Sequence, residues 1–164
     1  MKHSMLILLS VLVFSCNTNT QKQNENISIA EQYVKAVEAL DYKKMEALLG
    51  DNYQGFGPSI HHSIDKQTAL EKWKENAENL YLKIEYTRSE YSTVSIKDGE
   101  NQGDWVTIWG ELIIEYKDGR GPVKIWANSN YKIENGKIVK TYTIYNEADV
   151  LRQLGYVFIH PDDL

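Results

Sequence analysis

The sequence has a single cysteine, no run of basic residues and no apolar stretch long enough to cross a membrane. One cysteine excludes an intramolecular disulfide, so the fold must depend on its hydrophobic core. The 18 basic and 23 acidic residues give a net charge of −5, which disfavours nucleic-acid binding. A bilayer span needs roughly twenty apolar residues, and the apolar run from Met5 to Phe14 is much shorter.

Metal ligands are also scarce. The four histidines include no close-spaced pattern with the cysteine or with carboxylates of the kind that binds zinc. We therefore expect no metal and no cofactor.

The first sixteen residues have the order of a secretory signal. Lys2 and His3 precede the apolar run, and Ser15 stands just before Cys16. Residues 13–16 resemble a bacterial lipobox, which implies that residues 1–15 are removed and that Cys16 is lipidated. The alternative is an ordinary signal peptide with an incidental cysteine. We expect a cell-envelope protein anchored by lipid to a bacterial membrane, on the periplasmic or outer-membrane side.

The segment 16–27 is polar and lacks aromatic residues, which predicts a flexible tether. Ser28 and Glu31 fit a capping box, so a helix is expected to begin at Ser28 and to reach about Leu40. Asp41 is expected to cap a second helix that ends near Gly50. Residues 51–63 contain two glycines and a proline without periodicity, which predicts a loop.

The rest of the chain predicts a third helix and then strands. Asp65 is expected to cap the helix, and from Leu82 onward apolar residues alternate with polar ones. The long strands are expected at 105–116, 123–133 and 137–145, in an antiparallel sheet of about four strands, followed by a short helix near 148–154. Helices separated from strands along the chain indicate an α+β domain, here residues 28–164.

This order of elements resembles the nuclear transport factor 2-like superfamily. Asn135-Gly136-Lys137-Ile138, followed by Leu151-Arg152-Gln153-Leu154-Gly155, is similar to its SnoaL-like, polyketide-cyclase branch, over about residues 28–156. The resemblance implies a cone-shaped fold, with three N-terminal helices on a curved sheet and a pocket at the wide end. It also implies a homodimer through the outer face of the sheet.

Strand alternation places Thr141, Thr143 and Tyr145 on one side of the last strand. The resemblance directs this side toward the pocket, but Thr143 stands where the SnoaL-like branch usually has its catalytic acid. A threonine hydroxyl takes up no proton near neutral pH, so acid-base catalysis from this strand is disfavoured. The residues expected to line a ligand pocket are Tyr53, Phe56, Trp73, Trp109, Tyr131, Thr141, Thr143 and Tyr145.

Four residues are candidates for catalysis. Glu111 could act as a base if its strand face is concave, because burial against Trp109 would raise its pKa; on a convex face it would be a solvated or dimer-face residue. His61 and His62 could titrate near neutral pH, or could be solvated loop residues. Tyr53 could donate a hydrogen bond to a substrate oxygen, or simply pack in the core.

These observations support three hypotheses. The first is a lipid-anchored module that binds a small apolar or oxygenated molecule without catalysis. The second is an isomerase, cyclase or hydrolase with a pocket carboxylate or histidine as base. The third is a dimeric structural subunit of an envelope complex whose pocket is filled by its own side chains.

Overall fold

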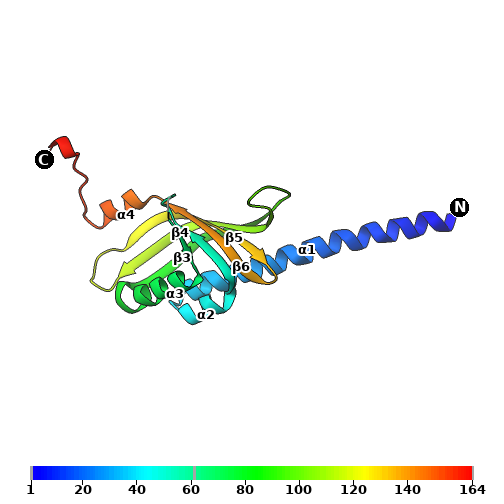
Figure 1. The fold of residues 1–164 in the computed structure, drawn as a ribbon, viewed down its shortest axis with the longest axis horizontal. Helices are drawn as coiled ribbons and strands as arrows, with labels where there is room; N and C mark the ends of the chain where they lie inside the picture. Colours follow the sequence, from blue (N-terminus) through cyan, green and yellow to red (C-terminus); the bar gives the residue numbers. More distant parts are fainter. Residues whose placement is uncertain (1, 61, 164) are drawn as a thin grey trace.

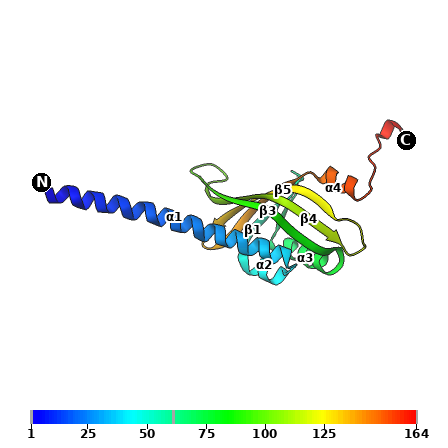
Figure 2. The ribbon, with the colours of Figure 1, turned by 180° about the vertical axis from the view of Figure 1, so that it is seen from behind.

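The structure is a computed structural model that describes residues 2–60 and 62–163, with side-chain detail from residue 20 onward. Figures 1 and 2 show a curved sheet with helices against one of its faces, the first helix projecting at one end and the C-terminal tail at the other. The elements are α1 (Lys2–Glu38), α2 (Tyr42–Leu48), β1 (Leu49–Phe56), β2 (Ser63–Asp65), α3 (Lys66–Glu75), a π turn (Asn76–Leu80), β3 (Tyr81–Ile96), β4 (Gly103–Tyr116), β5 (Val123–Glu134), β6 (Lys137–Tyr145), α4 (Glu147–Gln153) and a 3₁₀ turn (Pro161–Asp163).

The sheet is larger than the sequence predicted, and it is mixed. Its strand order is β2-β1-β6-β5-β4-β3. Strands β3 to β6 form the expected antiparallel succession, but β1 joins β6 in parallel, and β2 pairs with β1. The expectation of about four antiparallel strands was therefore wrong in number and, at one pair, in direction.

The prediction of a loop over residues 51–63 was also wrong. Its first half is β1, which places Phe56 opposite Tyr142 of β6. One of the two strands paired with β1 is β6, which lies almost ninety residues away along the chain. Local composition, rich in glycine and polar residues, therefore gave no sign of the pairing.

The predicted caps of the second and third helices are confirmed, and the predicted start of the first helix is wrong. The carboxylates of Asp41 and Asp65 accept hydrogen bonds from the backbone N–H groups of Lys44 and Thr68, as predicted. The first helix does not begin at Ser28, which lies inside α1. The part of α1 before Ser28 makes tertiary contacts. Asn26 is buried, and Lys22 forms an ion pair with Asp104 at 2.6 Å.

Flexibility of the segment 16–27 stays a prediction, and Cys16 precedes the residues whose side chains are described. No helix in the described part of the chain is both long and apolar enough to cross a membrane.

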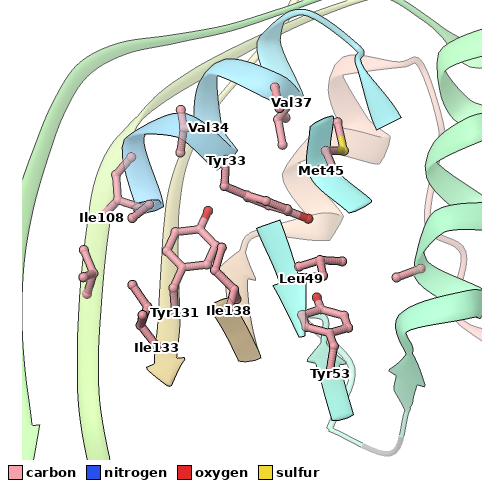
Figure 3. Packing of buried hydrophobic residues seen from close by; sticks show 14 of the residues in the cluster. Tyr33, Val34, Val37, Met45, Leu49, Tyr53, Ile108, Tyr131, Ile133 and Ile138 are labelled. Carbon is pink, nitrogen blue, oxygen red and sulfur yellow. The ribbon is translucent and has the colours of Figure 1, made fainter. Parts of the chain in front are cut away.

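The core lies between the helices and the concave face of the sheet. On β4 the inward residues Val106 and Ile108 are almost fully buried, and α1 contributes Val34 and Val37 from the opposite side (Figure 3). The other face of the sheet, called the outer face here, exposes large apolar side chains: Val94, Ile96, Trp109, Trp126 and Ile144.

Candidate ligand-binding site

A cavity of about 190 Å³ lies on the concave side of the sheet, where α1, β1 and α3 meet β5 and β6. No lining residue that the structure describes carries a charged side chain, and seven carry hydroxyl groups. The lining consists of Tyr33, Val37, Tyr53, Gly55, Phe56, Gly57, Ile64, Trp73, Tyr86, Ser129, Tyr131, Thr141 and Thr143.

The last strand supplies one hydroxyl wall of this cavity. Thr141 and Thr143 are two residues apart on β6 and therefore face the same side. Ser129 lies opposite Thr143 on β5, and their hydroxyls share a hydrogen bond of 3.2 Å. Tyr53 on β1 shares a buried hydrogen bond of 2.7 Å with the hydroxyl of Thr141. The parallel pairing of β1 with β6 thus brings Tyr53 into the site.

Helix α1 contributes the phenol of Tyr33, which lines the cavity together with the indole of Trp73. The indole N–H, which can only donate, acts on the Tyr33 hydroxyl in the direction that lowers its pKa, against the larger effect of burial. The phenol keeps its proton and can therefore donate a hydrogen bond to a ligand. Tyr131 approaches Tyr33 edge to face, with ring centroids 5.6 Å apart, and Figure 3 shows these two rings near that of Tyr53.

The phenols of this site are hydrogen-bond donors and not bases at physiological pH. Burial raises the pKa of Tyr33 and Tyr131 well above the ordinary value, and it also raises the pKa of Tyr53. The charged form of a phenol is costly to bury because it loses hydration. The site thus offers neutral donors and acceptors beside apolar walls.

Six of the eight expected pocket residues line this cavity: Tyr53, Phe56, Trp73, Tyr131, Thr141 and Thr143. The ring of Phe56, however, stacks on Tyr142, with centroids 4.8 Å apart. The other two residues lie elsewhere. Trp109 is on the outer face and 46% exposed, whereas Tyr145 packs in a second apolar cluster beside α4.

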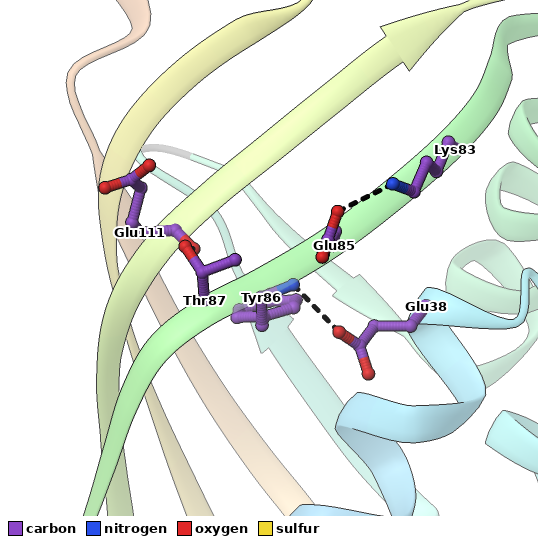
Figure 4. Close-up of polar contacts among 6 residues, drawn as sticks. All are labelled: Glu38, Lys83, Glu85, Tyr86, Thr87 and Glu111. Atoms are coloured by element: carbon purple, nitrogen blue, oxygen red, sulfur yellow. Dashed lines mark hydrogen bonds and ion pairs between the residues drawn. The ribbon is translucent and has the colours of Figure 1, made fainter.

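Glu111 lies on the outer face, away from the cavity. It stands opposite Trp126 in the register of β4 and β5 and forms an ion pair with Arg88, whose guanidinium also lies over the Trp126 ring. Figure 4 shows Glu111 directed away from α1, whereas Tyr86 lies on the helix side, where its backbone N–H donates to Glu38 at 2.8 Å. Glu111 therefore cannot act as the base of this pocket.

The histidines add no base among the described residues. His62 is exposed, with its Nδ1 3.4 Å from the Ser59 hydroxyl, and His61 lies outside the described residues. No group of three or more potential metal ligands gathers within the described part of the chain.

Sequence reasoning missed Tyr33, Tyr86 and Ser129 as pocket residues. Tyr33 belongs to the apolar stripe of the first helix, which is read as core by its spacing. The signal that could have revealed it is a phenol within that stripe, since a buried hydroxyl generally needs a hydrogen-bonding partner.

A wider cleft of about 580 Å³ lies between α2 and α3, but its character is different. Its lining is mainly charged and includes the ion pair of Lys66 with Asp51, whose side chain is fully exposed. We interpret this cleft as a solvated surface groove.

Gly55 offers a test of the pocket geometry. A Cβ atom at this position would lie 2.6 Å from the Tyr53 hydroxyl oxygen, so Gly55→Ala is expected to displace that hydroxyl from Thr141. Loss of a hydrogen bond typically costs about 1 kcal/mol, and unfolding by urea should show a decrease of at least that size. Gly57→Ala is the matched control, because a Cβ there meets nothing within 4 Å. Equal stability of both variants would contradict the geometry.

No family model matches this sequence, and no curated protein matches it. Solved structures do match. IdmH from Streptomyces antibioticus, a proposed polyketide cyclase, is 17% identical, with 80% of this chain and 99% of that chain covered at a TM-score of 0.61. An LEH-like epoxide hydrolase of Mycobacterium tuberculosis is 14% identical, with 81% and 91% covered at 0.58.

A nuclear transport factor 2-like protein of unknown function from Burkholderia pseudomallei is also 14% identical, with 80% of this chain and 98% of that chain covered at a TM-score of 0.60. At such identities the likeness establishes the fold and not the activity. The chain therefore has the α+β fold of nuclear transport factor 2-like proteins, and its described residues form four α-helices and a six-stranded mixed sheet.

Proposed function

We propose that this chain is a lipid-anchored domain of the bacterial cell envelope that binds a small uncharged molecule in its concave pocket. The observation that carries the proposal is the lining itself, which combines seven hydroxyl-bearing residues with apolar walls and, among described residues, no charge. The matching structures include a proposed cyclase and an epoxide hydrolase, which supports a pocket for organic molecules in this fold.

The chemistry of the lining defines the ligand. An ion in this pocket would lose its hydration without gaining a charged partner, which is strongly unfavourable. A neutral molecule with an oxygen acceptor would instead accept a hydrogen bond from the Tyr33 hydroxyl. The cavity of about 190 Å³ is below the size of typical drug-binding pockets, about 300–1,000 Å³, so the ligand is small.

The anchor is proposed from the sequence. The apolar run and the placement of the only cysteine after Ser15 support lipidation of Cys16. The lipid attached to that residue would hold the domain at the membrane, without a spanning helix.

Native mass spectrometry of the protein purified from its own host tests the binding proposal. A small adduct that is lost on denaturation is expected. Tyr33→Phe should weaken binding roughly tenfold and so reduce the bound fraction. The variant leaves an acceptor on the ligand unpaired, which costs about 1–3 kcal/mol, and about 1.4 kcal/mol corresponds to a factor of ten in affinity. Thr143→Val should also weaken binding. Unchanged occupancy in both variants would show that this face is not the site.

A catalytic alternative rests on one observation. The Tyr33 hydroxyl and the Trp73 indole N–H, which both line the cavity, could stabilise negative charge that develops on a substrate oxygen. The described residues of the pocket supply no ordinary general base, which is why we favour binding. Turnover of the molecule identified by mass spectrometry, abolished by Tyr33→Phe, would favour the enzyme.

We also propose that the protein is a homodimer. Trp109, Trp126 and Ile144 are 46%, 61% and 59% exposed on the outer face, and such exposed apolar patches commonly mark interaction surfaces.

A further inference from the structure

The C-terminal tail is one of the apolar surfaces that the described chain leaves uncovered. Gly155 ends α4 with a φ of 87°, and the Tyr156 N–H donates to the carbonyl of Leu151 at 3.0 Å. This is the Schellman arrangement that terminates helices. The next four residues are large and apolar, yet their exposed fractions are 53, 80, 56 and 56% for Tyr156, Val157, Phe158 and Ile159. A consecutive run of this kind calls for a partner.

A second such surface is a cleft of about 210 Å³ on the outer face, near the turn between β3 and β4. Val94, Ile96, Trp105 and Tyr142 form its apolar walls, and Val94 and Ile96 are 49% and 36% exposed. Amide and hydroxyl side chains complete the lining: Asn101, Thr107 and Asn130. This combination suits an extended segment, because apolar side chains can enter while the polar groups bond to its backbone.

The tail does not lie on the cleft of its own chain. Gln153 fixes α4 to β5 through two hydrogen bonds of 2.9 Å with the backbone of Lys124, and Lys124 lies opposite Ile113. The apolar wall formed by Trp105 is eight residues further along β4, a distance of about 27 Å at about 3.4 Å per residue. Phe158 is five residues after Gln153 and can extend at most about 18 Å. Figures 1 and 2 likewise show the tail at the opposite end of the sheet from the turn between β3 and β4.

We infer that the tail of one copy covers the outer cleft of a second copy. A two-fold axis that lies between the outer faces and perpendicular to the strands reverses the strand direction of the partner, so that each tail lies toward the far end of the other subunit. Such an interface is reciprocal, as two-fold symmetry requires, and it buries both uncovered surfaces at once. The inference rests on the proposed homodimer and is independent of ligand binding in the concave pocket.

Crosslinking between labelled copies tests the contact directly. Ile96→Cys and Phe158→Cys are introduced into separate full chains that also carry Cys16→Ser, and one chain is isotope-labelled. Mixing and oxidation should give a mixed-mass disulfide between residues 96 and 158. The pairing of Val94→Cys with Asp163→Cys, beyond the apolar run, serves as a less favourable contrast. Absence of the 96–158 product overturns the inference.

Truncation of the C-terminal tail tests the same contact through the dissociation constant of the dimer. A chain ending at Gly155 should dimerise at least tenfold more weakly in sedimentation velocity, whereas a chain ending at Ile159 should retain the full-length dissociation constant. Equal constants for both chains, or a full chain that stays monomeric, would refute the tail contact. Ligand occupancy per chain, from native mass spectrometry, should not change in either truncation, so failure here is distinct from failure of the binding proposal.

Discussion

Raising the pH from 10 to 12 is expected to destabilise the protein by several kcal/mol, because buried phenols must lose protons that the folded state retains. Burial raises the pKa of Tyr33 and Tyr131 well above the usual value, and burial together with neighbouring phenols raises that of Tyr81 to about 12. The unfolded chain releases the same protons near pH 10. Above that pH the unfolded state binds fewer protons than the folded state, so stability falls as pH rises.

The slope gives the size of the effect. Each phenol that stays protonated only in the folded state contributes about 1.4 kcal/mol per pH unit. Three such phenols give a loss of about 4 kcal/mol per unit, which over two units approaches the whole stability of a typical domain.

Urea unfolding between pH 8 and pH 12 measures this loss. Tyr33→Phe and Tyr131→Phe should each reduce the slope above pH 10 by about 1.4 kcal/mol per unit, whatever their effect at pH 8. Between pH 8 and pH 9 both states keep these protons, so variant and wild-type protein should show the same slope there. A flat profile to pH 12 would contradict the burial of these rings.

Met45→Ala is expected to destabilise the protein by about 2–5 kcal/mol, the usual cost of truncating a fully buried large side chain. Met45 has no exposed surface and belongs to the main core cluster. It is the buried residue of α2, a helix of seven residues that cannot persist without tertiary contacts. Because α2 leads directly into β1, the loss should also loosen Tyr53 in the pocket.

Urea unfolding at neutral pH measures the change, with Glu46→Ala as the matched control. Glu46 is the exposed neighbour of Met45 on the same helix, and a surface substitution of this kind usually changes stability by less than about 0.5 kcal/mol. A similar stability for both variants would show that α2 does not depend on this core contact.

The candidate site was predictable where local alternation decides orientation. Thr141 and Thr143 face the cavity because they are two residues apart on a strand whose bounds, Lys137–Tyr145, the sequence predicted. Glu111 is the contrary case. Alternation alone placed it with Trp109 on one face but could not say which face is concave. That depends on the curvature of the sheet and on where the helices pack.

The sequence by itself determined the features that arise from interactions between near neighbours. Asp41 and Asp65 cap their helices because a carboxylate reaches backbone N–H groups three residues away. Asn135 and Gly136 form the turn between β5 and β6, with φ values of 50° and 74°, because asparagine and glycine tolerate that conformation.

Tertiary structure decided the features that depend on residues far apart in the chain. The parallel pairing of β1 with β6 made a strand of a glycine-rich segment and placed Tyr53 2.7 Å from Thr141. Helix α1 extends beyond its expected cap at Ser28, and in this added part Lys22 pairs with Asp104 and Asn26 is buried. In both cases the stabilising partner is absent from any local window, so only the assembled fold could reveal it.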